Sequence, residues 1–492
     1  MAHESLPVIV LGAGAAGLAA AHELNRNGRA VTLVEAAPRV GGLCRTLEHR
    51  GYRFDLGGHR WFTKNADLDA WFHRLLGPEL VPVDRISRVH FEGRYFQYPI
   101  EVGDLLRKLG PRIMLDAGLR CVYAGLVQAL AAEPPKNMRQ AYIAQFGSRL
   151  YEMFFRRYSE KVWGQPCEQL SADWVSQRSK GLSLWTLLKD ALRLQREPVT
   201  SLIDRFYYPA TGYARLPERM AEDIVARGGE LRLSTRVRSV RWHGPEDLEV
   251  VCDREGQTEV LRGSAVLSTV PLGALVGMLD PACPAPVVEA ARGLVFRDLI
   301  TVNLILKRPQ VSTDTWVYVQ DESVLFGRLH EPKNWSPAMV PDAGTTSLVL
   351  ECFCSRGDAI WSLDDAALRE RCVRDLVERL HLIEAEDVVD AFIVRTTHAY
   401  PVYDLGYAER IATIRAHLDT LPGLHILGRS GTFRYNNADH SVEMGLLLAQ
   451  RMLGARLDHL AVNTEPTYQE IVRPGEEPAR DRFQLGQPAA RP

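Results

Sequence analysis

The chain has 492 residues, 46% hydrophobic and 24% charged, and is long enough for two or three folded domains. This composition excludes a disordered chain, a fibrous repeat and a disulfide scaffold. The 59 Lys+Arg and 61 Asp+Glu leave a net charge of -2, so no basic excess points to nucleic acid or a membrane. Its eight cysteines form no CxxC pair, and we expect reduced thiols, no metal site and a cytoplasmic location.

The N-terminal residues predict a strand, a glycine-rich turn, a helix and a second strand. Residues 7–11 (PVIVL) and 30–35 (AVTLVE) are short apolar runs rich in β-branched residues, and an alanine-rich stretch separates them. Gly12 permits the tight turn after the first strand, Gly14 lets a pyrophosphate approach the backbone, and Gly17 lets helix and strand pack closely. This pattern is typical of a dinucleotide-binding βαβ unit.

The start of this helix and the end of the second strand supply the expected ligand contacts. The first helical turn, with Ala15 and Ala16, presents free N–H groups and a partial positive charge to phosphates. Glu35 ends the second strand, where a carboxylate accepts a hydrogen bond from a ribose 2′-OH. An acid at this position disfavours a 2′-phosphate, and therefore disfavours NADP as the tightly held ligand.

Beyond this unit the hydrophobic pattern changes along the chain. Segment 101–208 has helical spacing and no strand-like run, whereas 230–270 and 295–400 contain short runs typical of strands. Residues 423–452 predict a strand, a turn and a final helix. The sequence therefore predicts an α/β fold with a discontinuous Rossmann-like dinucleotide-binding domain, a helical insertion and a mostly antiparallel β-sheet substrate domain. The expected segments are 1–80, 209–292 and 401–455 (dinucleotide domain), 81–100 and 293–400 (β-sheet domain), 101–208 (helical insertion) and 456–492 (surface tail).

A second glycine motif follows at residues 39–46 (RVGGLCRT). It resembles a motif of the large FAD superfamily that contains amine oxidases, protoporphyrinogen oxidases, phytoene desaturases and sugar mutases. The resemblance implies FAD as cofactor, and a late helix opened by residues 439–441 whose N-terminus faces the flavin. The residues expected at FAD are Gly12, Gly14, Ala15, Ala16, Gly17, Glu35, Arg39, Gly41, Gly42, Leu43, Arg45, Gly57, Gly58, His59, Val237, Gly428, Arg429, Asp439, His440 and Ser441.

Several further motifs resemble UDP-galactopyranose mutases. They occur in order at residues 57–62 (GGHRWF), 94–99 (RYFQYP), 158–164 (YSEKVWG), 325–328 (LFGR), 334–337 (NWSP) and 434–441 (RYNNADHS), the last being most similar to eukaryotic-type members. The resemblance implies a flavin-dependent isomerase that contracts a nucleotide-diphosphate sugar from pyranose to furanose, through an adduct at N5 of reduced FAD. A nucleotide-diphosphate sugar is the implied partner, and NADPH or NADH is a possible reductant for the flavin.

The same resemblance implies roles for individual residues. Guanidinium groups stabilise the charge that a departing diphosphate gains, and an aromatic face stacks on a nucleobase. Phe62 stands where bacterial members have a second histidine, and Ser159 stands where other members have Thr or Asn. The implied catalytic residues are His59, Arg178, Arg328, Arg429, Tyr400 and Tyr435, and the implied substrate-binding residues are Tyr158, Trp163, Phe96, Gln97 and Asn437.

Other interpretations of the same residues stay open. An FAD-dependent oxidoreductase of the amine oxidase, protoporphyrinogen oxidase or desaturase type would use the same cradle without needing several site arginines, and a flavoprotein that keeps FAD only as a scaffold is a third hypothesis. Trp163 alone is more typical of a core, and Glu160 with Lys161 is typical of a solvated pair. Segment 101–135 is apolar enough to dock a partner, and a buried helix bundle explains it equally well. The sequence indicates no particular sugar, nucleobase or oligomeric state.

Overall fold

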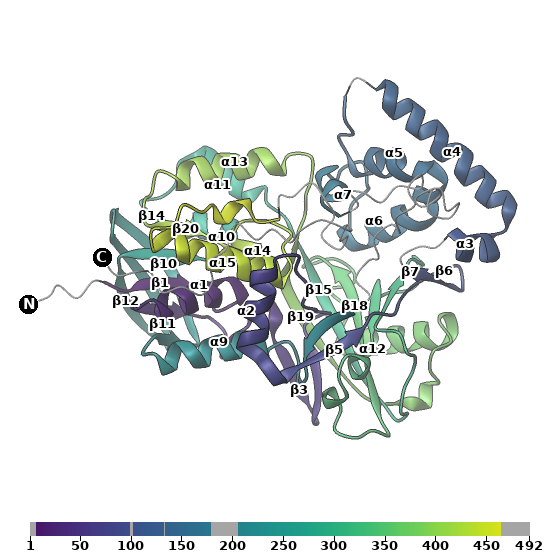
Figure 1. Cartoon of the computed structure of the whole chain (residues 1–492), viewed down its shortest axis with the longest axis horizontal. Coiled ribbons are helices and arrows are strands. Elements are labelled where there is room, and N and C mark those ends of the chain that lie inside the picture. Colours follow the sequence, from purple (N-terminus) through teal and green to yellow (C-terminus); the bar gives the residue numbers. More distant parts are fainter. Residues whose placement is uncertain (1–5, 99–101, 132, 179–204, 464–492) are drawn as a thin grey trace, which may run out of the picture.

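The computed structural model describes residues 6–98, 102–131, 133–178 and 205–463. Figure 1 shows a part that contains β1, α1 and α15 and is called here the nucleotide-binding part after the sequence prediction, a β-sheet part beside it and a helical part at the opposite end of the view. The predicted α/β class, with its helical insertion and its mostly antiparallel second sheet, is confirmed.

The nucleotide-binding part is built on a five-stranded parallel sheet in the order β20-β13-β1-β2-β9. Its strands are β1 (Val8–Leu11), β2 (Val31–Val34), β9 (Glu230–Arg232), β13 (Ala265–Ser268) and β20 (Leu424–Ile426). Every residue of β1 is fully buried, as expected for a parallel strand that is covered on both faces. The strands come from three distant stretches of chain, so the sheet is complete only when these stretches meet.

Successive residues of β1 pack into different layers. Val8 and Val10 pack with the helices α1, α9 and α15, whereas Ile9 and Leu11 pack with a small four-stranded sheet and with α10, α11 and α13. The small sheet has the order β12-β11-β10-β14. These elements are α1 (Ala15–Arg26), α9 (Arg215–Ala226), α10 (Leu272–Met278), α11 (Ala285–Arg292), α13 (Tyr407–Leu418), α14 (Gly428–Gly431), α15 (Ala438–Met452), β10 (Thr235–Gly244), β11 (Asp247–Arg254), β12 (Gln257–Gly263) and β14 (Leu279–Asp280).

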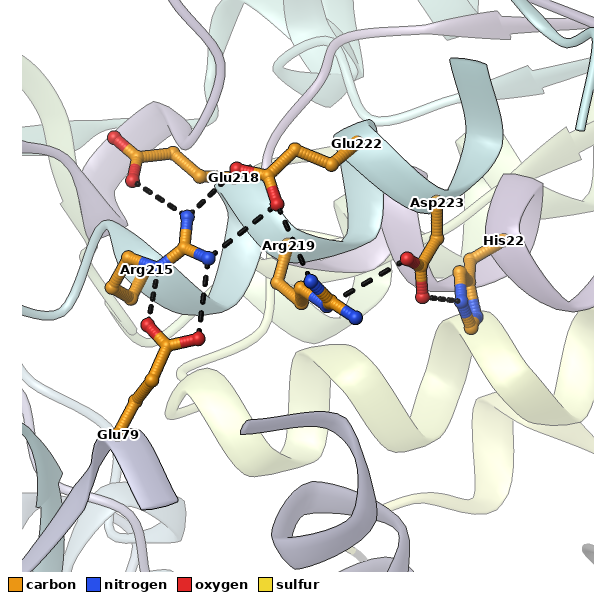
Figure 2. Close-up of polar contacts among 7 residues, drawn as sticks. All are labelled: His22, Glu79, Arg215, Glu218, Arg219, Glu222 and Asp223. Atoms are coloured by element: carbon orange, nitrogen blue, oxygen red, sulfur yellow. Dashed lines mark hydrogen bonds and ion pairs between the residues drawn. The ribbon is translucent and has the colours of Figure 1, made fainter. Parts of the chain in front are cut away.

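An ion-pair network joins α9 to its neighbours at the surface (Figure 2). Arg215 at the start of α9 pairs with Glu79 and, through Nη1, lies 2.8 Å from Glu222 Oε1. About two turns along α9 from Arg215, Asp223 Oδ2 lies 3.4 Å from Nε2 of His22 on α1. The network therefore ties α9 both to the turn after α2 (Ala66–Leu76) and to α1.

The second part is a seven-stranded sheet in the order β19-β15-β18-β17-β16-β6-β7, antiparallel except for the β16–β6 pair. Its central strands β15 and β18 are almost wholly buried, with α12 packed in the same apolar cluster. The elements are β6 (Ser87–Phe91), β7 (Arg94–Tyr98), β15 (Phe296–Leu306), β16 (Trp316–Val319), β17 (Arg328–His330), β18 (Thr346–Cys354), β19 (Val388–Pro401) and α12 (Asp365–Arg374).

The helical part and two hairpins complete the described fold. The helices are α3 (Val102–Leu109), α4 (Pro111–Leu130), α5 (Met138–Leu150), α6 (Arg157–Trp163) and α7 (Asp173–Arg178). The hairpins pair β3 (Thr46–His49) with β4 (Tyr52–Asp55), and β5 (Leu80–Asp84) with β8 (Arg205–Pro209). Short 3-10 helices lie at Gly42–Cys44, Gly77–Glu79, Pro332–Asn334, Pro337–Met339, Ala385–Asp387 and His459–Ala461, and π-helical turns lie at Tyr151–Arg156 and Asp375–Arg379.

Three expectations from the sequence need correction. The segment 101–208 ends in a strand, β8, because pairing with β5 overrides its local pattern. Residues 456–463 are not a surface tail, since His459 is buried with Nε2 3.1 Å from the carbonyl oxygen of Ile426; residues 464–492 lie outside the described chain. The helix α4 is not buried in a bundle, because its outer face is exposed.

Among the described residues, α4 is the single helix long and apolar enough to cross a membrane by length and composition, with a mean hydropathy of 1.4. Its inner face packs against α5, and in Figure 1 it forms the outer edge of the helical part. All eight cysteines are free thiols.

Candidate active site

A cavity of about 1010 Å³ lies where the three parts meet. The carboxyl ends of β1 and β2 open into it, as ligand sites do in open α/β sheets. The seven-stranded sheet and the helices α6 and α7 supply the opposite wall, so one space connects the predicted cofactor residues with most of the predicted substrate residues.

The glycines after β1 keep side chains out of the cofactor end of this cavity. Gly12 has φ +96°, and a Cβ added there would lie 2.1 Å from Oγ1 of Thr269. A Cβ on Gly17 would lie 2.2 Å from the carbonyl oxygen of Gly12, so this residue permits α1 to approach β1. Gly14 faces open space and lines the cavity, which leaves room for a pyrophosphate against the backbone.

The start of α1 has the features of an anion site. Gly14 is its N-cap and provides no side-chain hydrogen bond, so first-turn N–H groups stay available where Ala15 and Ala16 line the cavity. Glu35 also lines the cavity, and its carboxylate accepts hydrogen bonds of 2.8 Å from the backbone N–H groups of Ala13 and Ala37. This cradle therefore fits the diphosphate and ribose of a dinucleotide such as FAD.

In the second glycine motif some residues line the cavity, and one holds the loop in place. Gly41, Gly42 and Leu43 line the cavity, with φ of +114° at Gly41 and +56° at Gly42. Arg45 is not part of the wall, because its Nε donates to the carbonyl oxygen of Gly42 (2.9 Å) and braces this loop. Arg39 is exposed and also lies outside the wall, which corrects its expected contact with the cofactor.

The late helix contributes its first turn and the residues just before it. Gly428, Arg429, Asn437 and Ser441 line the cavity, as does Val237 from β10. Asp439 and His440 are buried outside the wall, because the first turn of a helix points only part of its circumference at one space. The His440 ring completes a capping box by accepting from the Asn437 N–H (3.2 Å), so its contribution is to the helix end.

Two adjacent motif residues, Gly58 and His59, line the cavity. A Cβ on Gly58 would lie 2.0 Å from the ring of Trp316, so only glycine lets this indole pack against the loop. Nδ1 of His59 lies 3.0 Å from the carbonyl oxygen of Gly57, which assigns the proton to Nδ1 and leaves Nε2 as an acceptor. Burial lowers the pKa of His59 to about 4, and the charges of the nearby arginines add to this, so the imidazole is neutral at pH 7.

Arg328 stands at the centre of the opposite wall. Its Nη2 pairs with Glu351 and also contacts the Tyr400 hydroxyl, and its guanidinium carbon lies 4.8 Å from the ring centre of Phe353. Glu351 is fully buried, and its second oxygen accepts from the N–H of Gly58 (3.3 Å). The Nε of Arg328 is buried and has no hydrogen-bond partner among the described residues, so one donor of this group is unsatisfied.

Arg429 is held by backbone and aromatic groups instead of a carboxylate. Its Nε and Nη1 donate to the carbonyl oxygens of Ala399 (2.8 Å) and Asn436 (2.7 Å). Its guanidinium carbon lies 4.2 Å from the ring centre of Tyr435 and 4.9 Å from that of Tyr400. Among the described residues it forms no ion pair, so its charge is not neutralised within the protein.

An aromatic surface surrounds these arginines. Trp163 at the end of α6 meets Tyr400 and Tyr435 at 6.5 and 6.0 Å between ring centres, and it lines the cavity although it is only 2% exposed. Trp163 is therefore both a core residue and a residue of the cavity wall, so its burial does not exclude a contact with a ligand. Tyr158, one turn earlier on α6, also lines the cavity.

Two predicted substrate-binding residues, Phe96 and Gln97, are not part of the described wall, and the predicted catalytic residue Arg178 is not tested by it. Phe96 is buried against Phe154 (5.5 Å between ring centres), and Gln97 on the other face of β7 is exposed. Tyr98, two residues along from Phe96, is the one that lines the cavity. Arg178 ends α7, and its side chain lies outside the described residues.

The sequence did not single out two residues that organise this wall. Glu351 is the single acid in a buried apolar run, SLVLECFC, and that isolation is the signal that marks it. Lys161 is partly buried and donates to the carbonyl oxygens of Asp321 (2.7 Å), Phe326 (3.0 Å) and Val319 (3.4 Å), so it is not one half of a solvated pair. Burial lowers the pKa of Lys161 to about 8. It ties α6 to the loop that precedes Arg328.

Comparisons with known proteins agree with this arrangement. The family model described as flavin containing amine oxidoreductase matches residues 15–453. The structure titled reduced UDP-galactopyranose mutase has a TM-score of 0.80 at 22% identity, covering 94% of this chain and 99% of that one, which shows a shared fold.

Two curated relatives match over shorter stretches. A probable UDP-galactopyranose mutase of Klebsiella pneumoniae is 23% identical over 227 residues, 44% of this chain and 53% of its own length. An L-amino-acid oxidase of Siganus canaliculatus is 40% identical over 77 residues, 15% of this chain and 14% of its own length. The chain thus spans about half or less of each of these relatives.

Proposed function

Because this chain belongs to the family of flavin-containing amine oxidoreductases, we propose that it is a flavin-dependent isomerase acting on a nucleotide-diphosphate sugar. The reaction is ring contraction of a hexopyranose to the furanose form, with no net oxidation. The solved mutase with a TM-score of 0.80 supports the fold that this proposal needs.

The observation that carries the proposal is unpaired positive charge and unpaired N–H groups beside the cofactor cradle. Arg429 has no carboxylate partner in the described protein, and the Nε of Arg328 has no hydrogen-bond partner. The indole N–H groups of Trp174 and Trp316, which also line the cavity, are unpartnered as well. A ligand rich in anionic oxygen, such as a diphosphate, satisfies these donors.

The chain's own residues have distinct tasks in this reaction. Arg328 and Arg429 would bind the diphosphate and stabilise the charge it gains as the bond to the anomeric carbon breaks. The Tyr400 hydroxyl would donate to the same group, and the neutral His59 would accept a proton from a sugar hydroxyl at Nε2. Reduced FAD, held by the cradle at Gly14 and its neighbours, would supply the electron-rich nucleophile, and NADPH or NADH would keep it reduced.

A second candidate, an oxidoreductase with an apolar substrate, is favoured by one feature of the cavity. The part of the cavity wall that the helical part supplies, from α5 and the following turn Tyr151–Arg156, is aromatic; its residues are Tyr142, Phe146, Phe154 and Phe155. An apolar molecule would bury well against these rings. Arg429 would then have no anionic partner among the described residues, and the Nε of Arg328 would have no acceptor; for this reason we prefer the isomerase.

The test uses the full chain loaded with FAD. We expect protein reduced with dithionite to convert a UDP- or TDP-hexopyranose to its furanose, detected by chromatography, with no electron acceptor consumed. Oxidised protein should not turn over. Bleaching of the oxidised flavin by an amine or a polyene, together with no furanose product, would support the oxidoreductase instead.

The matched variants are Arg429→Lys and the exposed-site control Arg238→Ala. Loss of an oriented donor at a site of developing charge costs roughly a hundredfold or more in kcat, so Arg429→Lys should lose most of its turnover while keeping FAD. Arg238 is 65% exposed on β10, and its variant should behave as the unmodified protein. FAD absorbance and thermal melting establish that both variants fold.

A further inference from the structure

The outer face of α4 is an apolar surface that no described part of this chain covers. It consists of seven exposed large side chains, Leu115, Leu119, Val122, Tyr123, Leu126, Val127 and Leu130. Their exposed fractions run from 50% to 87%. With about 150–200 Å² for each side chain fully in water, they present roughly 800 Å², which is above the usual largest patch of a monomer.

We infer that this face pairs with the same face of a second copy of the chain, α4 against α4, in an antiparallel two-fold dimer. The area is the first reason. A standard stable interface buries about 800 Å² on each partner, and this face alone offers that amount. A two-fold contact uses the same patch on both copies, so no second exposed surface is required.

The spacing of the side chains is the second reason. Leu115, Leu119, Val122, Leu126 and Ala129 alternate in steps of four and three residues, which is the spacing of a seam between two helices. All five positions are exposed. The series reads nearly the same from either end, with Val122 at its centre, so an antiparallel copy sets each apolar position opposite another.

The glycines of α4 give a third reason. Gly118 and Gly125 flank Val122 on the helix surface, four residues before it and three after it. Glycine in a helix interior is less stable than alanine, and no described atom beyond the neighbouring helix backbone lies within 4 Å of a Cβ placed at either position. The close approach that these glycines permit is therefore not used by the described part of the chain, and it lies at the centre of the proposed contact.

The charges around α4 favour another protein copy over a lipid surface. Three basic residues near the helix are paired with acids: Arg120 and Arg149 with Asp116, and Lys136 with Glu133. Helices that lie on anionic lipid carry a surplus of lysine and arginine on their polar side. The side of α4 that packs against α5 includes the buried small residues Ala117 and Ala124. Between Leu115 and Leu130 the single basic residue is Arg120, which pairs with Asp116 and so leaves no surplus of positive charge along the exposed face.

The first test measures the mass of the full chain in solution by light scattering at micromolar concentration. We expect a dimer of twice 55.2 kDa for the unmodified protein. The double variant Leu119→Glu with Leu126→Glu should be a monomer with unchanged FAD content. The control Val260→Glu, at a 51% exposed position on β12, should stay dimeric. A monomeric unmodified protein, or a dimer that survives the double substitution, would overturn the inference.

The second test reports the geometry of the contact. Val122 lies at the two-fold axis, so Val122→Cys in a Cys121→Ser background should form an intermolecular disulfide on mild oxidation, whereas Val260→Cys in the same background should not. The same chain is also floated with vesicles of phosphatidylcholine and phosphatidylglycerol. Flotation that depends on Leu119 and Leu126, without the Val122→Cys crosslink, would show that lipid covers this face and would refute the dimer.

Discussion

In the cofactor cradle the groups that face the cavity are mostly backbone, whereas in the wall around Arg328 and Arg429 they are side chains. The cradle is made by Gly12, Gly14 and Gly17, which lie within six consecutive residues and act by lacking a side chain. The wall brings together strands, helices and loops that are more than a hundred residues apart in sequence. The cradle is therefore sensitive to any added atom, and the wall is sensitive to loss of the contacts that position its charged groups.

The largest loss of stability and of bound FAD is expected from adding one carbon atom to the cofactor cradle. In Gly12→Ala the methyl group would meet Thr269 at 2.1 Å with φ at +96°, and overpacking with left-handed strain costs about 3 kcal/mol or more. We expect loss of most bound FAD, measured by absorbance. Gly28→Ala is the matched control, because Gly28 also has positive φ but has open space around it. Equal FAD loss in both variants would show that space at Gly12 is not decisive.

The next effect concerns a buried histidine behind the wall. Burial lowers the pKa of His330 from 6.5 in the unfolded chain to about 3 in the folded protein. Below pH 6.5 this histidine is therefore protonated in the unfolded chain but stays neutral in the folded protein. Folding stability is therefore lost in the window from 6.5 down to about 3, at about 1.4 kcal/mol per pH unit for one proton. His330→Phe should make stability between pH 7 and pH 5 less pH-dependent by roughly 2 kcal/mol, measured by denaturant unfolding. An unchanged pH slope would show that His330 is not the responsible group.

A smaller effect should separate positioning from stability. Lys161 and Lys333 each donate to three backbone carbonyls, but Lys333 binds Pro309, Ala343 and Thr345 away from the cavity. Both Lys→Met variants should lose similar stability. Only Lys161→Met should lose turnover, by roughly tenfold or about 1.4 kcal/mol, with a larger effect on kcat than on KM because Arg328 is misplaced. Equal kinetics in both variants would mean that Lys161 is structural only.

The smallest effect is expected at the ion-pair network of α9 (Figure 2), outside both regions. Arg215→Ala removes contacts to Glu79 and Glu222, which are partly exposed. Such pairs contribute about 0.2–1 kcal/mol each, so the free energy of unfolding should fall by about 1 kcal/mol and FAD binding should not change. The loss should shrink at high salt. A loss of several kcal/mol would show that the surface network matters as much as the cradle.

The same contrast explains what could be predicted from the sequence. The β1–α1 turn was predictable because its function depends on residues spaced a few positions apart. The neighbourhood of Glu351 was not, since its partners Arg328 and Gly58 become its neighbours only through the register of β17 and β18 and the loop after β4. The resemblance nevertheless supplied Arg328, Arg429, Tyr400 and Tyr435, and the structure brings these four together on one cavity.

The errors have a common physical origin. Phe96 and Arg39 belong to motifs that touch the cavity, but neither side chain lines it, because neighbouring residues of a strand or loop point in different directions. Lys161 was expected in solvent because single-sequence patterns do not show which backbone carbonyls lack partners. A motif therefore locates a segment near a site more reliably than it assigns each of its side chains.

The order of strands in the parallel sheet has a consequence for synthesis of the protein on the ribosome. β1 and β2 emerge early, but their neighbours β9 and β13 lie some two hundred residues later and β20 lies near residue 425. At about 5–20 residues per second, the nascent chain waits on the order of 10 to 40 s with the apolar edge of β2 unpaired. The five-stranded sheet that carries the cradle is therefore complete only late in synthesis, and molecular chaperones have a defined interval in which to shield the N-terminal strands.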